Sequence, residues 1–151
     1  MDEFIQYLPE LRIAYAHRTG PYGPGNLETM ERIKEWAREN GLLTRAAVLL
    51  GISQDDPRKV PPEHCRYDAC IGVDEAFPID PPMLDGRFDG GLYAIRRIPH
   101  TAEAVQKAWE EIVPALQKAG YRIDDKPALE RYSGELLLRH ECEICVPVLP
   151  Q

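Results

Sequence analysis

The alternation of apolar and polar positions predicts two amphipathic helices. Apolar residues recur at helical spacing across residues 27–37, with Asn26 placed to cap the helix start. A second apolar stripe covers residues 105–119 and follows Thr101, which is the expected cap of that helix. Pro114 falls inside this stripe, and a proline there removes one hydrogen bond and crowds the preceding turn. We therefore expect the second helix to be kinked or divided at Pro114.

Shorter runs with period-two alternation predict two strands before and two strands after each helix. These runs are residues 4–8, 11–18, 46–52 and 66–73 in the first half, and 84–88, 91–98, 128–132 and 141–148 in the second. The order strand-strand-helix-strand-strand thus occurs twice. It predicts a single α+β domain over residues 1–151, made of two modules, 1–75 and 76–151, with pseudo-twofold symmetry. One module leaves part of its sheet uncovered, so the two should share one curved, mainly antiparallel sheet.

Composition narrows the classes of partner. A chain of 151 residues that is 44% hydrophobic can bury a core of its own. Its net charge of -7 repels the phosphate backbone, so direct binding to nucleic acid is disfavoured. The apolar runs are too short to span a bilayer, and the start Met1–Asp2–Glu3 does not resemble a secretory signal. We therefore expect a cytoplasmic protein with no membrane partner.

The cysteine and glycine patterns do not predict a metal or a cofactor. Cys142 and Cys145 lie three apart on a predicted strand, and Cys65 and Cys70 lie five apart, so each pair points to opposite faces. We therefore expect four free thiols and no metal. The glycine-rich segment 20–25 contains two prolines, which remove the backbone donors that a phosphate cradle requires.

Five motifs in order resemble the GyrI-like (SbmC) family. They are His17–Tyr22, Gly51–Pro57, Cys65–Cys70, Gly91–Ala94 and Glu141–Val148. The family includes free-standing proteins and the effector domains of AraC-type and MerR-type multidrug regulators. The resemblance implies duplicated modules with an aromatic-lined cleft for bulky, often cationic, small molecules. Because Met1 lies only a few residues before the first predicted strand, the chain resembles the free-standing branch.

Glu130 is the residue that this resemblance selects. The segment Ala128–Tyr132 is similar to the family's strand motif, although Leu129 stands where an aromatic residue is usual. The resemblance implies that Glu130 is the pocket carboxylate, on the same strand face as Tyr132. Without it, a solvated glutamate paired with an arginine is the more ordinary interpretation. The candidate aromatic walls are Tyr22, Trp109, Tyr67 and Tyr93, whereas Trp36 is better explained by core packing.

Three functions are compatible with these residues. The first is the binding of a hydrophobic or cationic small molecule for sequestration or sensing. The second is inhibition of DNA gyrase through protein–protein contact, which the family name suggests. The third is hydrolysis of a cyclopropane-bearing toxin, with Glu130 as general base and the substrate between Tyr22 and Trp109. We rank them in this order and expect no catalytic residue in the first two. Alternation also places Asp68 and Glu143 opposite the apolar sets, where we expect solvent exposure.

Overall fold

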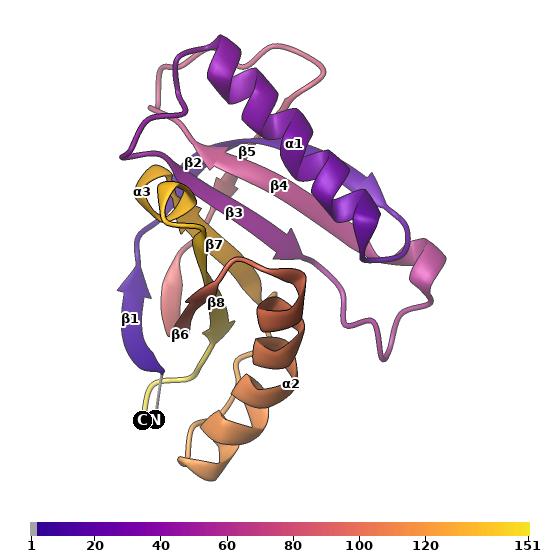
Figure 1. Cartoon of the computed structure of the whole chain (residues 1–151), viewed down its shortest axis with the longest axis vertical. Coiled ribbons are helices and arrows are strands. Elements are labelled where there is room, and N and C mark those ends of the chain that lie inside the picture. Colours follow the sequence, from indigo (N-terminus) through magenta and orange to yellow (C-terminus); the bar gives the residue numbers. More distant parts are fainter. Residues whose placement is uncertain (1–2) are drawn as a thin grey trace.

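A single antiparallel sheet with accompanying helices forms the molecule in the computed structural model, which describes residues 3–151 (Figure 1). Met1 and Asp2, which entered the expectation of a cytoplasmic protein, lie outside the described residues. The elements are β1 (Phe4–Leu8), β2 (Leu11–Thr19), α1 (Pro24–Glu39), β3 (Val48–Ser53), the 3-10 turn η1 (Pro62–His64), β4 (Arg66–Gly72), β5 (Leu84–Phe88), β6 (Gly91–Pro99), α2 (Ala102–Lys118), β7 (Leu129–Ser133), α3 (Gly134–Leu138) and β8 (Glu141–Pro147). Within these residues, no helix is long and apolar enough to cross a membrane.

The strand order shows the pseudo-twofold symmetry. The sheet runs β1-β6-β8-β7-β3-β4-β2-β5, and exchanging β1 with β5, β2 with β6, β3 with β7 and β4 with β8 gives the same order in reverse. Helix α1 contacts β2 and β4, and α2 contacts the equivalent strands β6 and β8. The α+β fold of two modules is therefore as predicted. The edge strands are exchanged between the modules, because β1 pairs with β6 and β5 pairs with β2. The division at residues 75 and 76 remains our proposal.

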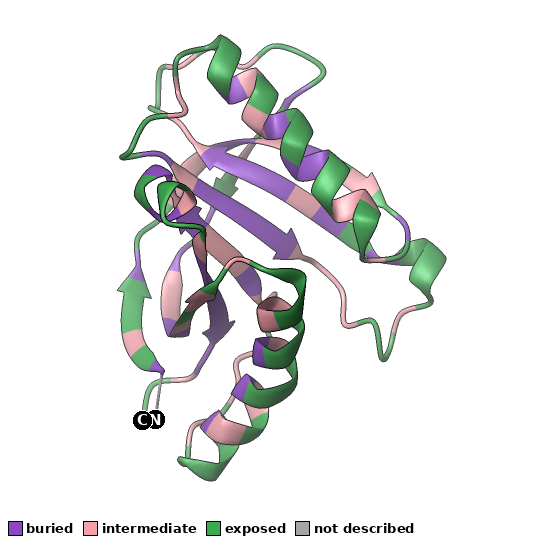
Figure 2. Cartoon of the chain, viewed as in Figure 1, coloured by how far each residue is buried: buried purple, intermediate pink, exposed green. Residues whose placement is uncertain are grey.

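The two faces of the sheet pack against different partners. The face that carries α1 and α2, here called the helix face, holds one apolar cluster under each helix. The opposite face, here called the inner face, holds a third cluster in which Leu8 of β1 and Phe88 of β5 both take part. Since the two edges of the sheet meet in one cluster, the sheet curls around its inner face. The buried residues lie mainly in the sheet and on the sides of the helices that face it, whereas the outer sides of both helices are exposed (Figure 2).

The start of α1 differs from the prediction. The helix begins at Pro24, three residues earlier than the expected start at Leu27, and Gly23 rather than Asn26 is its cap residue. Pro24 occupies the first helical turn. The N–H groups of that turn have no carbonyl acceptor within the helix, so a proline there loses no hydrogen bond. The Asn26 side chain instead accepts a hydrogen bond of 2.8 Å from Arg18. Leu27, expected on the buried stripe, is 65% exposed.

The second helix agrees more closely with the sequence. The Thr101 side chain accepts a hydrogen bond of 3.1 Å from the Ala104 N–H, which confirms the predicted cap. The helix is not divided at Pro114, because α2 continues through it as one element. Helix α3 was not predicted. It is a short turn capped by Ser133, whose hydroxyl accepts from the Leu136 N–H.

Candidate functional site

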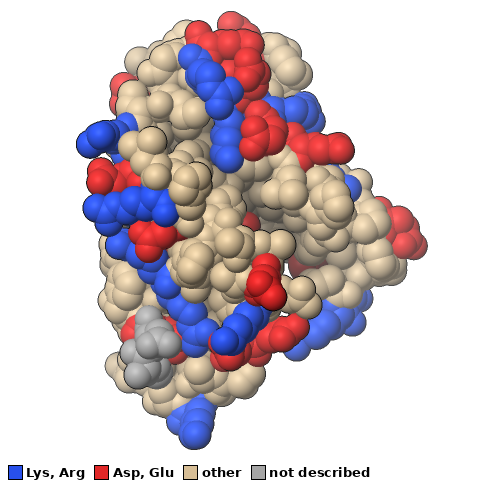
Figure 3. Space-filling view, viewed as in Figure 1, with Lys and Arg blue, Asp and Glu red and all other residues tan. Residues whose placement is uncertain are grey.

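Glu130 lies near the pseudo-twofold, where β7 meets β3. It is opposite Gly51 of β3 and Ile144 of β8 in the sheet register. Gly51 is two residues from Leu49, which packs in the cluster under α1, so Gly51 is on the helix face as well. Ile144 packs in the cluster under α2. Residues opposite each other in the register share a face, so Glu130 points to the helix face between the two helices. Figure 3 shows that this face is hollowed between α1 and α2, with acidic atoms visible inside the hollow. The sheet register thus places the Glu130 side chain on the face of the sheet that lies between the two helices.

Gly51 shapes the floor beside Glu130. A Cβ atom at Gly51 would lie 2.6 Å from the Tyr67 hydroxyl oxygen, so the phenol of Tyr67 crosses directly over this glycine. The position requires glycine because of this close approach. Tyr67 is buried, and its pKa is raised chiefly by burial and secondly by the charge of Glu130. The structure thus brings the predicted wall residue Tyr67 close to Glu130.

The environment of Glu130 favours the protonated carboxyl. Its pKa is raised from the ordinary value because burial penalises the charged form. The nearby side chain of Trp109 opposes part of this rise. Trp109 is half-buried on α2, and it packs against the cluster under that helix. Trp109 is therefore the second predicted wall residue that the structure places at Glu130.

Tyr132 adds a further aromatic ring on the same face as Glu130. The Lys34 ammonium of α1 lies 5.6 Å from the centre of the Tyr132 ring. The His100 ring lies 5.3 Å from it and is tilted by 35°. Burial lowers the pKa of His100, and the nearby Lys34 lowers it further. The Tyr132 ring already accommodates one cation on its face, which is the chemistry of a cation–π contact.

Two apolar residues connect the helices across the depression. Ile98 and Val105 pack against both the cluster under α1 and the cluster under α2. Cys142 lies on the same face, and burial first and the Glu130 charge second raise its pKa to about 12. Its thiol is therefore protonated at neutral pH. Cys145 points to the inner face, as the strand periodicity predicted.

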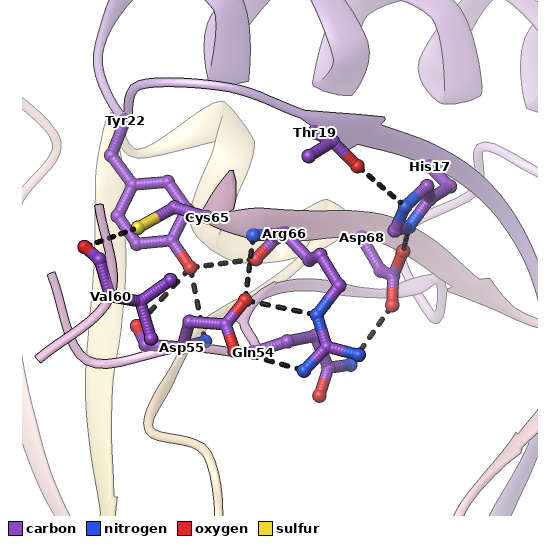
Figure 4. A network of polar contacts seen from close by, with 9 residues as sticks. All are labelled: His17, Thr19, Tyr22, Gln54, Asp55, Val60, Cys65, Arg66 and Asp68. Carbon is purple, nitrogen blue, oxygen red and sulfur yellow. Dashed lines mark hydrogen bonds and ion pairs between the residues drawn. The ribbon is translucent and has the colours of Figure 1, made fainter. Parts of the chain in front are cut away.

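Tyr22 has a different environment from the one expected. Its hydroxyl donates to the Arg66 carbonyl oxygen at 2.7 Å and accepts from the Asp55 N–H at 3.1 Å (Figure 4). Asp55 is bound in turn by the Arg66 guanidinium at 2.9 Å, which with a backbone hydrogen bond lowers its pKa to about 2. Tyr22 packs against the cluster under α1, and its hydroxyl holds the loop between β3 and β4. The polar end of Tyr22 is thus committed to this loop.

Tyr93 and Trp36 do not join Glu130. Tyr93 lies in the inner-face cluster, 6.0 Å from Phe88 between ring centres, so the sheet separates it from Glu130. Trp36 packs edge-to-face against Phe77 at 6.0 Å, which agrees with the core role expected for it. Of the four predicted wall residues, the structure gathers Tyr67 and Trp109 around the carboxylate.

The expectation of an exposed Glu143 is wrong. Its side chain is on the inner face as alternation predicted, but the residue is only 2% exposed and it is paired with two arginines. Asp68 is partly exposed and contacts the Nδ1 atom of His17 at 2.5 Å and the Gln54 amide at 2.9 Å (Figure 4). A buried carboxylate requires such partners, because burial without them is strongly unfavourable.

Comparison with known sequences identifies relatives over nearly the whole chain. Residues 1–149 match the family described as the GyrI-like small molecule binding domain. The SPbeta prophage-derived protein YosT of Bacillus subtilis (strain 168), which bears the name of a transcriptional regulator, is 41% identical over 145 residues, or 95% of this chain and 97% of YosT. A DNA gyrase inhibitor of Pectobacterium carotovorum subsp. carotovorum (strain PC1) is 28% identical over 120 residues, or 78% of this chain and 77% of that protein.

Solved structures share the fold at low sequence identity. The EcmrR–DNA complex in EcmrR-RPo matches with a TM-score of 0.76 and 14% identity, covering 99% of this chain and 57% of the EcmrR chain. A hydrolase from Listeria innocua matches with a TM-score of 0.66 and 12% identity over 98% of this chain and 92% of that one. SAV2435 bound to tetraphenylphosphonium matches with a TM-score of 0.59 and 17% identity over 99% and 94%. These likenesses concern the fold, while the match over residues 1–149 places the chain in the family of GyrI-like small-molecule-binding domains.

Proposed function

We propose that this protein binds bulky hydrophobic cations between α1 and α2, with Glu130 as their counter-charge. The observation that carries the proposal is the position of Glu130 near the seam of the two modules. It is partly buried there, its pKa is raised by burial, and Trp109 and Tyr67 lie beside it. A carboxylate that burial destabilises gains most from a cation that replaces the lost water.

The energetic terms favour a cation over a neutral ligand of the same shape. Two opposite charges in contact attract by about 4 kcal/mol at an effective dielectric near 20. Aromatic rings such as Trp109 and Tyr67 add about 0.5–2 kcal/mol each when they face a desolvated cation. The apolar side chains Ile98 and Val105 offer surface to the rest of the ligand. Charge therefore supplies selectivity, and apolar area supplies affinity.

The relatives support this interpretation. SAV2435, which has the same fold, has a structure bound to tetraphenylphosphonium, a bulky hydrophobic cation. The family's description as a small molecule binding domain agrees with it. The regulator name of YosT favours sensing of the ligand over simple sequestration.

Tetraphenylphosphonium is the probe that tests the proposal. We expect Glu130→Gln to weaken its binding by tenfold or more, or about 1.4 kcal/mol or more, because the substitution keeps the volume but deletes the charge. Binding of the neutral analogue triphenylphosphine oxide should change by less than threefold. Calorimetric titration of both compounds into the wild type and the variant measures the two effects.

Glu141→Gln is the matched control. Glu141 is also a partly exposed glutamate, on the neighbouring strand β8, but alternation places it on the inner face with Cys145. The Glu141→Gln substitution removes one negative charge. It should leave the affinity for tetraphenylphosphonium within about twofold of the wild-type value, because charges separated across the protein are screened by salt. Equal losses for the two compounds, or equal losses in the two variants, would remove Glu130 from the ligand site.

Gyrase inhibition is the second candidate function. It is favoured by the 28% identity to the Pectobacterium inhibitor and by a net charge of -7, which suits a partner with a basic DNA-binding surface. A supercoiling assay with purified gyrase tests it, and inhibition that persists in Glu130→Gln would assign it to a separate surface.

Hydrolysis of a strained ring is a third candidate. The raised pKa of Glu130 suits a general base, and turnover of an activated cyclopropane that Glu130→Gln abolishes would establish it.

A further inference from the structure

The inner face carries a second charged site, with the opposite sign to Glu130. Arg97 of β6, Glu143 of β8 and Arg131 of β7 are neighbours in the sheet register. The Glu143 carboxylate receives the Arg131 guanidinium at 2.6 Å and the Arg97 guanidinium at 3.1 Å, one on each oxygen. One buried carboxylate thus holds two guanidinium groups, so the row carries a net charge of about +1.

A cavity of about 150 Å³ lies beside this row, and we call it the arginine pocket. Its lining residues are Arg97, Arg131, Ser133, Glu135, Leu136, Arg139 and Glu143. The three arginines outnumber the two glutamates, and Glu143 has both oxygens occupied. Ser133 accepts the Leu136 N–H, which leaves the hydroxyl proton free to donate. The pocket therefore offers more donors than acceptors, which is the chemistry of an anion site.

Arg139 is the arginine that can turn to a ligand at the lowest cost. It contacts Glu135 at 3.4 Å, and both side chains are about half exposed. Exposed ion pairs of this kind contribute little to stability, so breaking the pair costs little. Arg131 and Arg97 instead have fixed positions, because they neutralise the buried Glu143. The pocket combines two preorganised guanidinium groups with one mobile group.

Arg131 also lines a smaller apolar cavity of about 40 Å³. The other lining residues of this cavity are Leu8, Pro9, Leu11, Val48, Leu50 and Phe88. Because one arginine side chain borders both cavities, a ligand held by its anionic group at the arginine pocket can place a short apolar part along Arg131. An inorganic ion would leave this apolar surface unused.

We propose that the arginine pocket binds the carboxylate group of a small amphiphilic anion, with its short apolar chain directed to the cavity beyond Arg131. Glu130 and Arg131 are consecutive residues of β7 and point to opposite faces. The chain therefore has a site for a cation on the helix face and a site for an anion on the inner face. This second site does not depend on the function proposed for Glu130.

Sodium hexanoate is the probe for this site, with sodium acetate and inorganic phosphate as comparisons. Arg139→Gln should weaken hexanoate binding about tenfold, because it removes one charge-assisted hydrogen bond. Arg38→Gln is the matched control. Arg38 is an exposed helical arginine that pairs with Glu35 at 2.7 Å, and it lies on α1 away from the pocket. The control should leave the hexanoate affinity within about twofold.

Backbone amide shifts provide the readout, followed with and without saturating tetraphenylphosphonium. The proposal predicts shifts centred on Arg97, Ser133 and Glu143, tighter binding of hexanoate than of acetate or phosphate, and no displacement by the cation. Unchanged hexanoate affinity in Arg139→Gln, or the absence of saturable binding in the wild type, would overturn the site. Tighter binding of phosphate would overturn the assignment to a carboxylate amphiphile. Displacement by tetraphenylphosphonium would show a single shared site.

Discussion

Gly51→Ala is a sharp perturbation of the floor beneath the proposed ligand. The added Cβ would lie 2.6 Å from the Tyr67 hydroxyl oxygen and 3.3 Å from the ring carbon that carries it. Tyr67 is only 4% exposed, so its ring cannot simply swing into solvent. Either the ring moves within the core or β3 shifts away from it. Both movements alter the contacts of Glu130, which pairs with Gly51 in the sheet.

The expected cost follows from two opposing terms. Overpacking a buried site costs about 1–3 kcal/mol. Replacing glycine by alanine restricts the unfolded chain and returns about 0.4–1 kcal/mol where the backbone accepts it. We therefore expect Gly51→Ala to lower the free energy of unfolding by about 1–2 kcal/mol. For a chain of this length the melting temperature should fall by about 2–8 °C. Affinity for tetraphenylphosphonium should also fall, because Tyr67 no longer occupies its place beside Glu130.

Gly72→Ala provides the matched control, and Tyr67→Phe provides the rescue. A Cβ at Gly72 would have the Leu11 Cδ1 atom as its nearest neighbour at 3.7 Å, which is an ordinary contact. The control should therefore be neutral or slightly stabilising. Removing the Tyr67 hydroxyl deletes the 2.6 Å contact, so the double variant should recover part of the loss. Urea unfolding of the wild type, Gly51→Ala, Tyr67→Phe and the double variant measures these terms as a double-mutant cycle. A Gly51→Ala protein as stable as the Gly72→Ala control, or an absence of recovery with Tyr67→Phe, would refute the packing described for this floor.

Three further predictions concern Glu130 and the caps. Glu130→Gln should raise the melting temperature at neutral pH, because the raised pKa of Glu130 means that its ionised form destabilises the folded state. The wild type loses stability as pH rises from 4.5 through the raised pKa. In thermal scans, the difference in melting temperature between the variant and the wild type should therefore vanish below pH 4.5. Trp109→Phe should raise the pKa of Glu130 further and reduce cation affinity, since it removes the polar indole group that lowers this pKa. A fall of the Glu130 pKa in the variant, measured by NMR titration of the carboxyl carbon, would contradict this. Thr101→Ala should cost about 1 kcal/mol by leaving the Ala104 N–H without its cap, and an unchanged free energy of unfolding in urea would exclude this role.

The regular elements were predictable because each depends on local periodicity. The two long helices and the strands appear near their expected positions, and the cap at Thr101 is a direct consequence of its hydroxyl. The prediction of Asn26 as a cap was wrong because its side chain accepts a hydrogen bond from Arg18, eight residues away in sequence. Helix α3 has five residues, and a segment that short has no periodicity to detect.

Alternation on a strand predicts which side chains share a face, whereas Glu130 itself was selected by the family resemblance. Glu130 and Tyr132 share a face because they are two residues apart. Gly51 was not predicted as part of the site, although a glycine within an apolar strand is a signal of a close contact. Tyr93 shows the limit of the method. Alternation fixes that successive residues face opposite sides, but only the packing of α2 decides which side holds Glu130. No feature of the sequence placed Lys34 and His100 at the Tyr132 ring, because they come from separate elements.

The most direct test of the account is the pKa of Glu130, measured by NMR titration of its side-chain carboxyl carbon with and without saturating tetraphenylphosphonium. We expect a pKa above the ordinary value of 4.5 in the free protein, because burial disfavours the charge. The bound cation should lower that pKa, and by linkage its affinity should decrease as pH falls through the titration of Glu130. A pKa that does not change when tetraphenylphosphonium saturates the protein would contradict the proposal that Glu130 is the counter-charge of the ligand.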